Sequence, residues 1–284
     1  MILIVGASGY IGNYLFSQFK KEGFDVLGTY FKNKKEGMLY FDLASMGIDE
    51  LKGINDVRYV IIAAAANAKI DESRIHWEYN YKVNVLSTKN LIDYCFKHGI
   101  IPIYLSSDGV FDGVKGNYKE TDERKPVNCY GKIRFEVENH LINSKKPFVI
   151  LRSGRIFGTD IKDGTLITGM LRSMKNGKSL KCAADNVFTP TYIKDLFDFV
   201  KFIIGKKYTG IFHIASLKAT NRYEIAKAVR KFFRIKNANI TPCKIDSLNL
   251  LDKRAKLTSL NIGKYKKLTG CKEKKIEYFL DMVK

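Results

Sequence analysis

The chain has 284 residues, 45% of them hydrophobic, so it is long enough for one large α/β unit or two small domains with a sizeable core. Its 49 Lys and Arg residues against 29 Asp and Glu residues give a net charge of +20, which would attract phosphorylated ligands or nucleic acid. The lysines are dispersed, and no zinc-finger, RRM or KH signature accompanies them. We therefore expect a solvated basic surface and no nucleic-acid partner.

Two further features of the composition concern the compartment and metals. No apolar run reaches the length of a membrane span, and residues 1–5 lead into a glycine without a charged segment before them, so we expect a cytoplasmic protein without signal peptide or membrane contact. Five cysteines are odd in number, widely spaced and free of any C-x-x-C motif. This pattern argues against a disulfide framework and against a zinc site, so we predict reduced thiols and no metal.

The first 150 residues are predicted to alternate strands and helices. A short apolar run at 2–5 predicts a strand, and apolar residues at helical spacing predict a helix over 11–21. Such alternation is typical of an α/β fold with a doubly wound parallel sheet. Further strands are predicted at 25–30, 57–66, 100–105 and 147–151, and further helices at 72–97 and 130–143.

Beyond Arg152 the alternation is less regular. Residues 154–164 are predicted to form a loop, and one further strand is predicted at 210–215. Helices are predicted at 166–176, 193–204, 222–233 and 275–282. No repeat or flexible linker separates this half of the chain from the first, so we expect it to form a smaller lobe.

A glycine-rich turn joins the first predicted strand to the first predicted helix. Gly6, Gly9 and Gly12 stand at spacings of three. Small residues let the backbone approach a pyrophosphate, and the N–H groups at the start of the helix hold its charge. An ordinary βα turn is the alternative, but strand, turn and helix in this order favour a dinucleotide site. We include in this site the other members of the motif, Ser8, Tyr10 and Ile11.

These elements predict a Rossmann-type doubly wound parallel sheet with a smaller, interleaved C-terminal substrate-binding lobe. Residues 1–153 would form the dinucleotide-binding Rossmann domain, with 187–214 returning to it. Residues 154–186 and 215–284 would form the smaller lobe.

The end of the second strand distinguishes the two nicotinamide dinucleotides, because an acidic side chain there binds a ribose 2′-hydroxyl. This chain has Thr29 and Lys32 there and no acid, which favours NADP(H), with NAD(H) as the alternative. Surface decoration would explain any single lysine equally well. Asp42, next to Leu43 after the following short strand, is a candidate for binding adenine, although an acidic turn residue would also explain it.

Tyr130 and Arg134 are four residues apart, so they share one face of the predicted helix. Reduction of a ketone needs a hydride at the carbonyl carbon and a proton for the developing alkoxide. A cation one turn away stabilises the phenolate that a proton-donating tyrosine leaves behind. Ser106 and Ser107 follow a predicted strand at the edge where open α/β sheets bind ligands, so one hydroxyl can orient the carbonyl. Alone, the Tyr–Arg spacing is usually a surface pair, but the glycine turn and the serines favour a catalytic site.

Three motifs together resemble extended short-chain dehydrogenase/reductases, in particular the dTDP-4-dehydrorhamnose reductase group. They are the glycine turn at 6–12, the run at 106–113 and the run at 126–132 around Tyr130. The methionine adenosyltransferase regulatory β subunit, a relative in this group, shares them. The similarity continues at 151–158, 188–196 and 210–215, so it covers nearly the whole chain.

The resemblance implies an NADP-dependent oxidoreductase of deoxysugar and polysaccharide biosynthesis that reduces a nucleotide-linked 4-keto-6-deoxysugar. It implies that Ser107 orients the carbonyl, that Tyr130 donates the proton and that Asn84 is the family's active-site asparagine. A homodimer is also compatible with the resemblance. Residues implied at the cofactor are Ala63, Ala64 and Ala65, and those implied at the substrate are Ser106, Asp108, Arg155, Thr191 and Arg254.

The chain departs from the family pattern at three positions. Arg134 stands where the family has lysine, Gly109 where it has tyrosine, and Ala255 where it has proline. Arginine keeps the positive charge but cannot pass on a proton, so we expect turnover to suffer more than cofactor binding. The loss of an aromatic wall at Gly109 suggests a bulkier or differently oriented sugar.

Two other functions are compatible with these residues. One is a catalytically weakened, NADP-binding regulatory or partner subunit, which would explain Arg134 directly. The other is a sugar-nucleotide epimerase or dehydratase of the same superfamily, but the run Asp108-Gly109 lacks the glutamate that a dehydratase needs.

Overall fold

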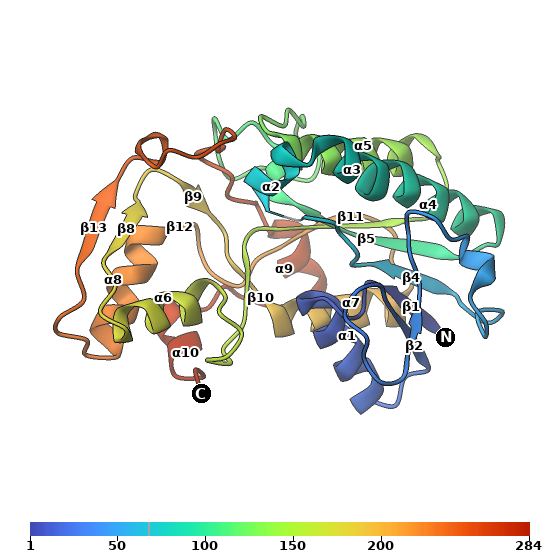
Figure 1. Ribbon diagram of the computed structural model, residues 1–284, viewed down its shortest axis with the longest axis horizontal. Helices are drawn as coiled ribbons and strands as arrows, with labels where there is room; N and C mark the ends of the chain where they lie inside the picture. The colour runs from blue at the N-terminus through green and yellow to red at the C-terminus, as the bar shows by residue number, and fades with distance from the viewer. Residues whose placement is uncertain (68) are drawn as a thin grey trace. The chain divides into compact units, whose positions relative to one another are not determined.

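The computed structural model describes residues 1–67 and 69–284 (Figure 1). Within this range the chain forms two compact units, each built from three segments. Unit 1 comprises Met1–Ser107, Cys129–Leu151 and Phe197–Ile211, and unit 2 comprises Asp108–Asn128, Arg152–Leu196 and Phe212–Lys284.

A seven-stranded sheet has the strand order β11-β6-β5-β4-β1-β2-β3. Strand β1 pairs in parallel with both β2 and β4, so the order reverses on either side of it. Ligands of open α/β sheets bind at such a reversal, beyond the carboxyl ends of the strands. The predicted doubly wound sheet is confirmed. Its strands are β1 (Ile2–Val5), β2 (Val26–Tyr30), β3 (Met38–Tyr40), β4 (Tyr59–Ile62), β5 (Ile101–Ser107), β6 (Val149–Ser153) and β11 (Gly210–Ile214).

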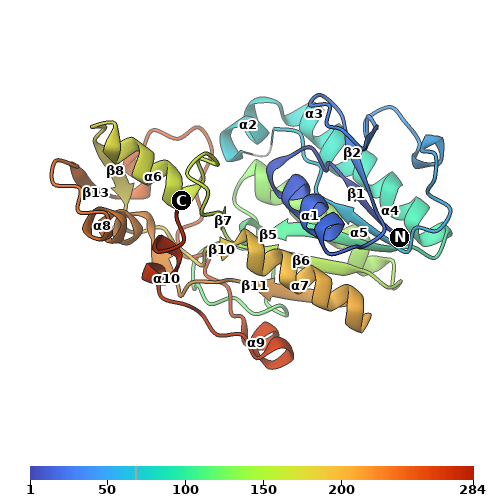
Figure 2. The ribbon, with the colours of Figure 1, turned by 90° about the horizontal axis from the view of Figure 1, so that it is seen from below.

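Helices cover both faces of this sheet. Helices α1 (Tyr10–Lys21) and α7 (Ile193–Lys206) lie on one face, and α4 (Thr88–Lys97) and α5 (Cys129–Asn143) lie on the other (Figures 1 and 2). Helices α1 and α7 meet through Phe19 and Phe197, whose ring centroids are 4.9 Å apart. Alternating βα units with apolar helix faces produce these three layers, because each face of a parallel sheet must be covered.

The predicted helix over 72–97 was wrong in its continuity. The structure has α2 (Ile70–Ile75), a break at His76, α3 (Trp77–Tyr81), the π-helix η2 (Lys82–Ser87) and then α4. A π-helix accommodates an extra residue per turn while the apolar residues keep facing the core, so hydrophobic spacing does not reveal it. The π-helix contains Asn84, a residue singled out by the sequence.

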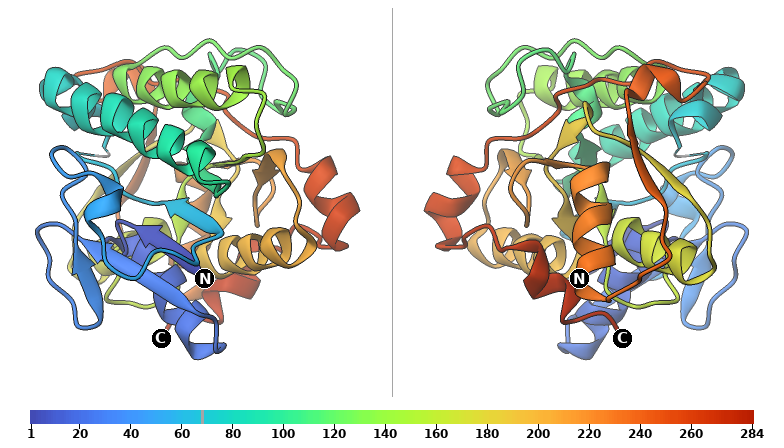
Figure 3. Two further views of the ribbon diagram at one scale, coloured as in Figure 1. Left: turned by 90° about the vertical axis from the view of Figure 1, so that its right-hand side faces the viewer. Right: turned by 90° about the vertical axis from the view of Figure 1, so that its left-hand side faces the viewer.

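Unit 2 contains a parallel two-stranded sheet of β8 (Leu180–Ala183) and β13 (Ile240–Cys243), accompanied by α6 (Leu166–Lys175) and α8 (Arg222–Phe232) (Figure 3). Neither strand was predicted from the sequence, because both are short and partly exposed and therefore show no clear alternation of apolar and polar residues. The smaller elements of unit 2 are η3 (Asp108–Val110), β7 (Ile156–Phe157), β9 (Val187–Phe188), β10 (Thr191–Tyr192), β12 (Thr220–Asn221), η4 (Ile245–Ser247), α9 (Gly263–Thr269) and α10 (Ile276–Leu280).

The described residues contain neither a helix that could cross a membrane nor a cluster of metal-binding side chains. In the ranges 1–67 and 69–284, every helix is too short or too polar to cross a membrane. In the same ranges, no three His, Cys, Asp or Glu side chains come together as a metal site.

Candidate functional site

The glycine turn between β1 and α1 needs glycine at two of its three positions for steric reasons. Gly6 has a φ of 86°, and a Cβ there would lie 2.5 Å from the backbone of Ala64. A Cβ at Gly12 would lie 2.2 Å from the carbonyl oxygen of Gly6. These two glycines therefore let β1, β4 and α1 pack closely, whatever ligand is bound.

Gly9 differs from the other two glycines. It is exposed, and a Cβ there would meet only the Gly6 carbonyl oxygen, at 3.5 Å. The fold itself would therefore accept a larger residue at this position. A glycine that the fold does not require, at the start of a helix, fits a site where the backbone approaches a pyrophosphate.

The end of β2 carries the predicted nucleotide-selecting residues. Thr29 is buried, and its hydroxyl accepts a hydrogen bond from the Gly6 N–H at 3.0 Å, so it holds the glycine turn against β2. Lys32 is exposed and lies over the ring of Phe31 at 5.8 Å. Lys35 reaches back to α1, where its ammonium donates to Asn13 Oδ1 at 2.8 Å. Lys35 is far from α1 in the sequence, and only the fold brings it to the first turns of that helix.

Asn84 fixes the small-residue loop that follows β4. Its side-chain amide donates to the Ala66 carbonyl oxygen at 2.8 Å and accepts from the Ala66 N–H at 2.7 Å. This paired contact explains an asparagine inside a helical segment, because the amide replaces a missing backbone partner for the loop. The preceding residues of that loop, Ala63, Ala64 and Ala65, are half-buried.

Asp42 is occupied within its own turn. One carboxylate oxygen accepts from the Ala44 N–H at 3.0 Å and the other from the Ser45 hydroxyl at 2.7 Å. The neighbouring Leu43 packs against the hydrophobic core. The local hydrogen bonds account for Asp42 as a turn residue.

Tyr130 and Arg134 lie one turn apart on the same face of α5, where Tyr130 is half-buried and Arg134 is buried. Arg134 is only 9% exposed, and its guanidinium lies over the rings of Tyr130 and Tyr104 at 5.1 and 5.5 Å. One guanidinium nitrogen donates to the Tyr104 hydroxyl at 3.1 Å. Burial lowers the pKa of Arg134, but the two phenols more than offset this effect, so its pKa is raised overall and the side chain stays protonated.

Arg134 Nε has no hydrogen-bond partner, although it is buried. Among residues 1–67 and 69–284 it is the one such side-chain atom. An unsatisfied buried N–H is costly and therefore calls for a partner that the chain does not supply. A ribose hydroxyl would be a suitable acceptor, so Gly9 and Arg134 both fit a nicotinamide dinucleotide.

The two serines at the end of β5 have different surroundings. Ser106 donates its hydroxyl to Glu138 Oε1 at 2.6 Å in the interior of unit 1. Ser107 is the last residue of β5 and is also buried. Side chains alternate along a strand, so Ser107 does not share the direction of Ser106. The sequence did not single out Tyr104 or Glu138, because both read as ordinary members of a strand and a helix.

The remaining predicted substrate residues lie in unit 2. Asp108 accepts a hydrogen bond from the Thr258 hydroxyl at 2.8 Å, and the buried Thr191 donates its hydroxyl to the Ile214 carbonyl oxygen at 2.9 Å. Arg155 is exposed. Arg254 lines an open cavity of about 590 Å³ within unit 2. The other residues that line this cavity are Asp112, Gly113, Val114, Val127, Asp185, Asp246, Lys253, Ala255, Lys256 and Leu257.

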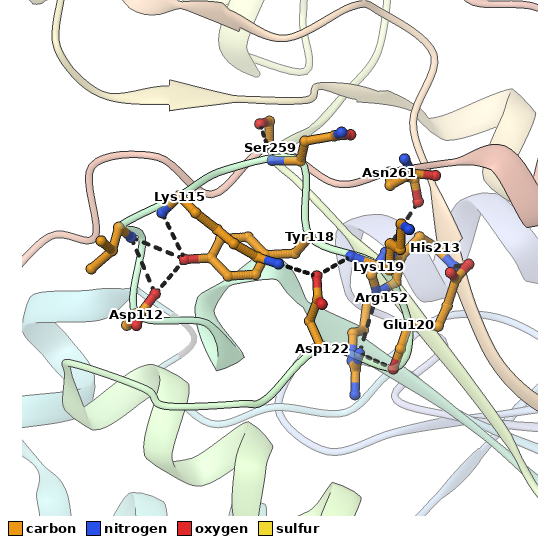
Figure 4. A network of polar contacts seen from close by, with 12 residues as sticks. Asp112, Lys115, Tyr118, Lys119, Glu120, Asp122, Arg152, His213, Ser259 and Asn261 are labelled. Atoms are coloured by element: carbon orange, nitrogen blue, oxygen red, sulfur yellow. Dashed lines mark hydrogen bonds and ion pairs between the residues drawn. The ribbon is translucent and has the colours of Figure 1, made fainter.

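Unit 2 also has a buried polar network that the sequence did not predict (Figure 4). Arg152 is fully buried, lies over the Phe111 ring at 5.1 Å and contacts His213 Nε2 at 3.2 Å. His213 Nδ1 lies 3.2 Å from the Asn261 carbonyl oxygen. Arginine only donates and a carbonyl only accepts, so His213 carries its proton on Nδ1 and is neutral. Burial and the charge of Arg152 lower the pKa of His213 to about 3.

The fold and these residues define a Rossmann-type α/β protein whose first unit carries a glycine turn and a tyrosine–arginine pair. Residues 1–283 match the family described as RmlD substrate binding domain. The chain belongs to this family, as the resemblance had implied.

Three similar proteins support this assignment. A dTDP-4-dehydrorhamnose reductase from Aggregatibacter actinomycetemcomitans is 32% identical over 80% of this chain and 77% of its own length. A methionine adenosyltransferase 2 subunit beta from Xenopus tropicalis is 26% identical over 84% of this chain and 74% of its own length. A crystal structure of a dTDP-4-dehydrorhamnose reductase from Bacillus anthracis, in complex with NADP, has a TM-score of 0.86 at 21% identity. That match covers 99% of this chain and 97% of the other.

The neutral His213 predicts a pH dependence of stability. In the unfolded chain His213 binds a proton below its ordinary pKa of 6.5, whereas in the folded chain it binds one only below about pH 3. The free energy of unfolding therefore falls as the pH falls through this window. The contribution is about 1.4 kcal/mol per pH unit. In urea unfolding from about pH 7 to about pH 5, His213→Asn should lose about 2 kcal/mol less than the parent. The exposed His76→Asn serves as control, and equal pH slopes for all three proteins would contradict the prediction.

Proposed function

We propose that the protein is an NADPH-dependent reductase that converts the keto group of a nucleotide-linked 4-keto-6-deoxysugar to an alcohol. The observation that carries this proposal is the half-buried Tyr130, with the guanidinium of Arg134 over its ring at 5.1 Å. The similarity to a dTDP-4-dehydrorhamnose reductase at 32% identity supports the substrate class.

Several residues of unit 1 would hold the dinucleotide. Gly6, Gly9 and Gly12 would cradle the pyrophosphate at the start of α1, and the Nε–H of Arg134 would bind a ribose hydroxyl. When bound, the cofactor would supply the hydride that the carbonyl carbon needs. The 2′-phosphate of NADP(H) would meet the positive charge of Lys32 and Lys35, and no acidic side chain repels it at the end of β2.

Tyr130 would donate the proton that the developing alkoxide needs, which leaves a phenolate. Arg134 would stabilise that phenolate by its positive charge, which lies against the Tyr130 ring. Because Arg134 remains protonated, it cannot return a proton to Tyr130 as a lysine would. Proton donation is therefore retained, while the return of the proton to Tyr130 is the step that the substitution slows.

Ser107 is our candidate for the hydroxyl that orients the carbonyl, because Ser106 already donates to Glu138. In unit 2, we propose that the cavity lined by Arg254 binds the nucleotide portion of a substrate. Arg254 and the neighbouring Lys253 and Lys256 would attract a diphosphate at this cavity.

A second candidate function is a regulatory or partner subunit that binds NADP but turns over slowly. The similarity to methionine adenosyltransferase 2 subunit beta and the substitution by Arg134 both favour it. The two candidates differ in turnover and agree in cofactor binding, so both quantities must be measured.

The direct test of the reductase proposal uses Tyr130→Phe. With NADPH and a panel of nucleotide 4-ketosugars, the parent should oxidise NADPH, and Tyr130→Phe should lower kcat about 100- to 10 000-fold because the general acid is lost. The Kd for NADPH, measured by fluorescence titration, should change less than about threefold, since the phenol contributes little to ground-state binding. If the parent oxidises no NADPH with any sugar of the panel, the reductase proposal is wrong.

Replacement of Arg134 by lysine distinguishes the two candidate functions. In a reductase limited by reprotonation of Tyr130, Arg134→Lys should raise kcat about tenfold, because lysine can exchange its proton. In a regulatory subunit the same change should leave turnover at background. The Kd for NADPH shows whether the variant is intact, and Lys132→Arg, elsewhere on α5, controls for a change of cation.

Lys35 should select NADP(H) over NAD(H). Its ammonium is held by Asn13 at the first turns of α1, so Lys35→Gln should weaken NADPH binding about tenfold and leave NADH binding unchanged. The adjacent exposed Lys34→Gln is the matched control and should weaken NADPH binding less than about twofold. Equal effects of the two changes on NADPH affinity would refute a specific role for Lys35.

A further inference from the structure

Glu138 is a fully buried carboxylate in unit 1. It follows Tyr130 by two turns and Arg134 by one turn of α5, so the three side chains share one helix face. Buried carboxylates are expensive unless they are hydrogen-bonded, and they are retained where they perform a task. The proposed reaction gives Glu138 no direct part.

Glu138 connects α5 to the end of β5. Its Oε1 accepts the Ser106 hydroxyl at 2.6 Å, a short charge-assisted hydrogen bond in the interior. Ser106 immediately precedes Ser107, our candidate for orienting the carbonyl. Arg134 makes a parallel connection one turn earlier, to the Tyr104 hydroxyl at 3.1 Å and to the Leu105 carbonyl oxygen at 3.3 Å.

Two successive turns of α5 thus hold alternate residues of one strand. Tyr104 and Ser106 are two positions apart, so they point to the same face of the sheet. Each meets a charged side chain of α5, Tyr104 the cation and Ser106 the anion. The strand cannot slide along the helix without breaking both contacts.

The charges of Arg134 and Glu138 also have opposite effects on the pKa of the Tyr104 phenol. Burial raises the pKa of Tyr104, Arg134 lowers it, and Glu138 raises it further. Both charges are therefore felt at the Tyr104 hydroxyl, whose ring faces the same guanidinium as Tyr130. Two ion pairs join α4 to another face of α5, Lys89 with Glu136 and Asp93 with His140.

We propose that Glu138 is a positioning residue for the reduction: it anchors Ser106, and thereby the end of β5 with Ser107, and its charge moderates the field of Arg134 at the proton donor. The proposal rests on the proposed function, since it assigns Glu138 a role relative to Tyr130 and Ser107. A structural carboxylate alone would affect stability and leave the pH profile of turnover unchanged.

The test compares Glu138→Gln, Ser106→Ala and a control, Glu136→Gln. The control is the same substitution two residues earlier, where the carboxylate is partly exposed and paired with Lys89. Glu138→Gln should lower kcat about tenfold and move the alkaline fall of kcat, which reports loss of the donated proton, to lower pH. The sign follows because removal of a negative charge favours the phenolate. Ser106→Ala should lower kcat with the parent's pH profile, because it keeps the charge.

Glu136→Gln should match the parent within about twofold in kcat and in its pH profile. Urea unfolding and the Kd for NADPH identify variants that fail to fold. If Glu138→Gln does not fold, Glu138→Asp takes its place, because it keeps the charge and shortens the side chain. Glu138→Asp should lower kcat in the same way as Ser106→Ala. A folded Glu138→Gln with the parent's kcat and pH profile overturns the inference. A parent without turnover overturns the proposed function, which is a separate result.

Discussion

The burial of one positive charge between two phenols is the interaction on which the candidate site depends. Arg134 lies against Tyr130 on its own helix and against Tyr104 on β5, and burial in this place keeps the guanidinium close to both. A charge of this kind is stable inside a protein only where hydrogen bonds and neighbouring dipoles compensate for lost hydration. The contacts with Tyr104 and the Leu105 carbonyl therefore fix Arg134, and with it α5, on the sheet.

In the proposed reduction, Arg134 would separate two tasks that a lysine at this position could combine. Stabilisation of a phenolate needs a nearby positive charge, and a guanidinium supplies it. Return of a proton to Tyr130 needs a group that can lose one, and a guanidinium cannot. The unsatisfied Nε–H of Arg134 adds a buried donor at this place. Cofactor binding and slow turnover are compatible in such a site, which is why the enzyme and the regulatory subunit are close alternatives.

Some parts of the fold and site could be predicted from sequence, because they depend on local spacing. The glycine turn predicted the β1–α1 junction, and the spacing of Tyr130 and Arg134 predicted their common helix face. The break at His76 and the π-helix around Asn84 were missed, since an extra residue in one turn leaves the apolar pattern intact. The short strands β8 and β13 were missed because each is stabilised by its partner and has little alternation of its own.

The sequence by itself determined the class of the fold, the order of its elements and the residue types available at the site, since periodicity and motif spacing act within one element. Only the tertiary structure decided what each side chain touches. It showed that Gly6 and Gly12 are required by packing whereas Gly9 is not, that Thr29 holds the glycine turn, and that Ser106 is bound to Glu138. These contacts join residues 23 and 32 positions apart, and no local pattern encodes a distance between separate strands and helices.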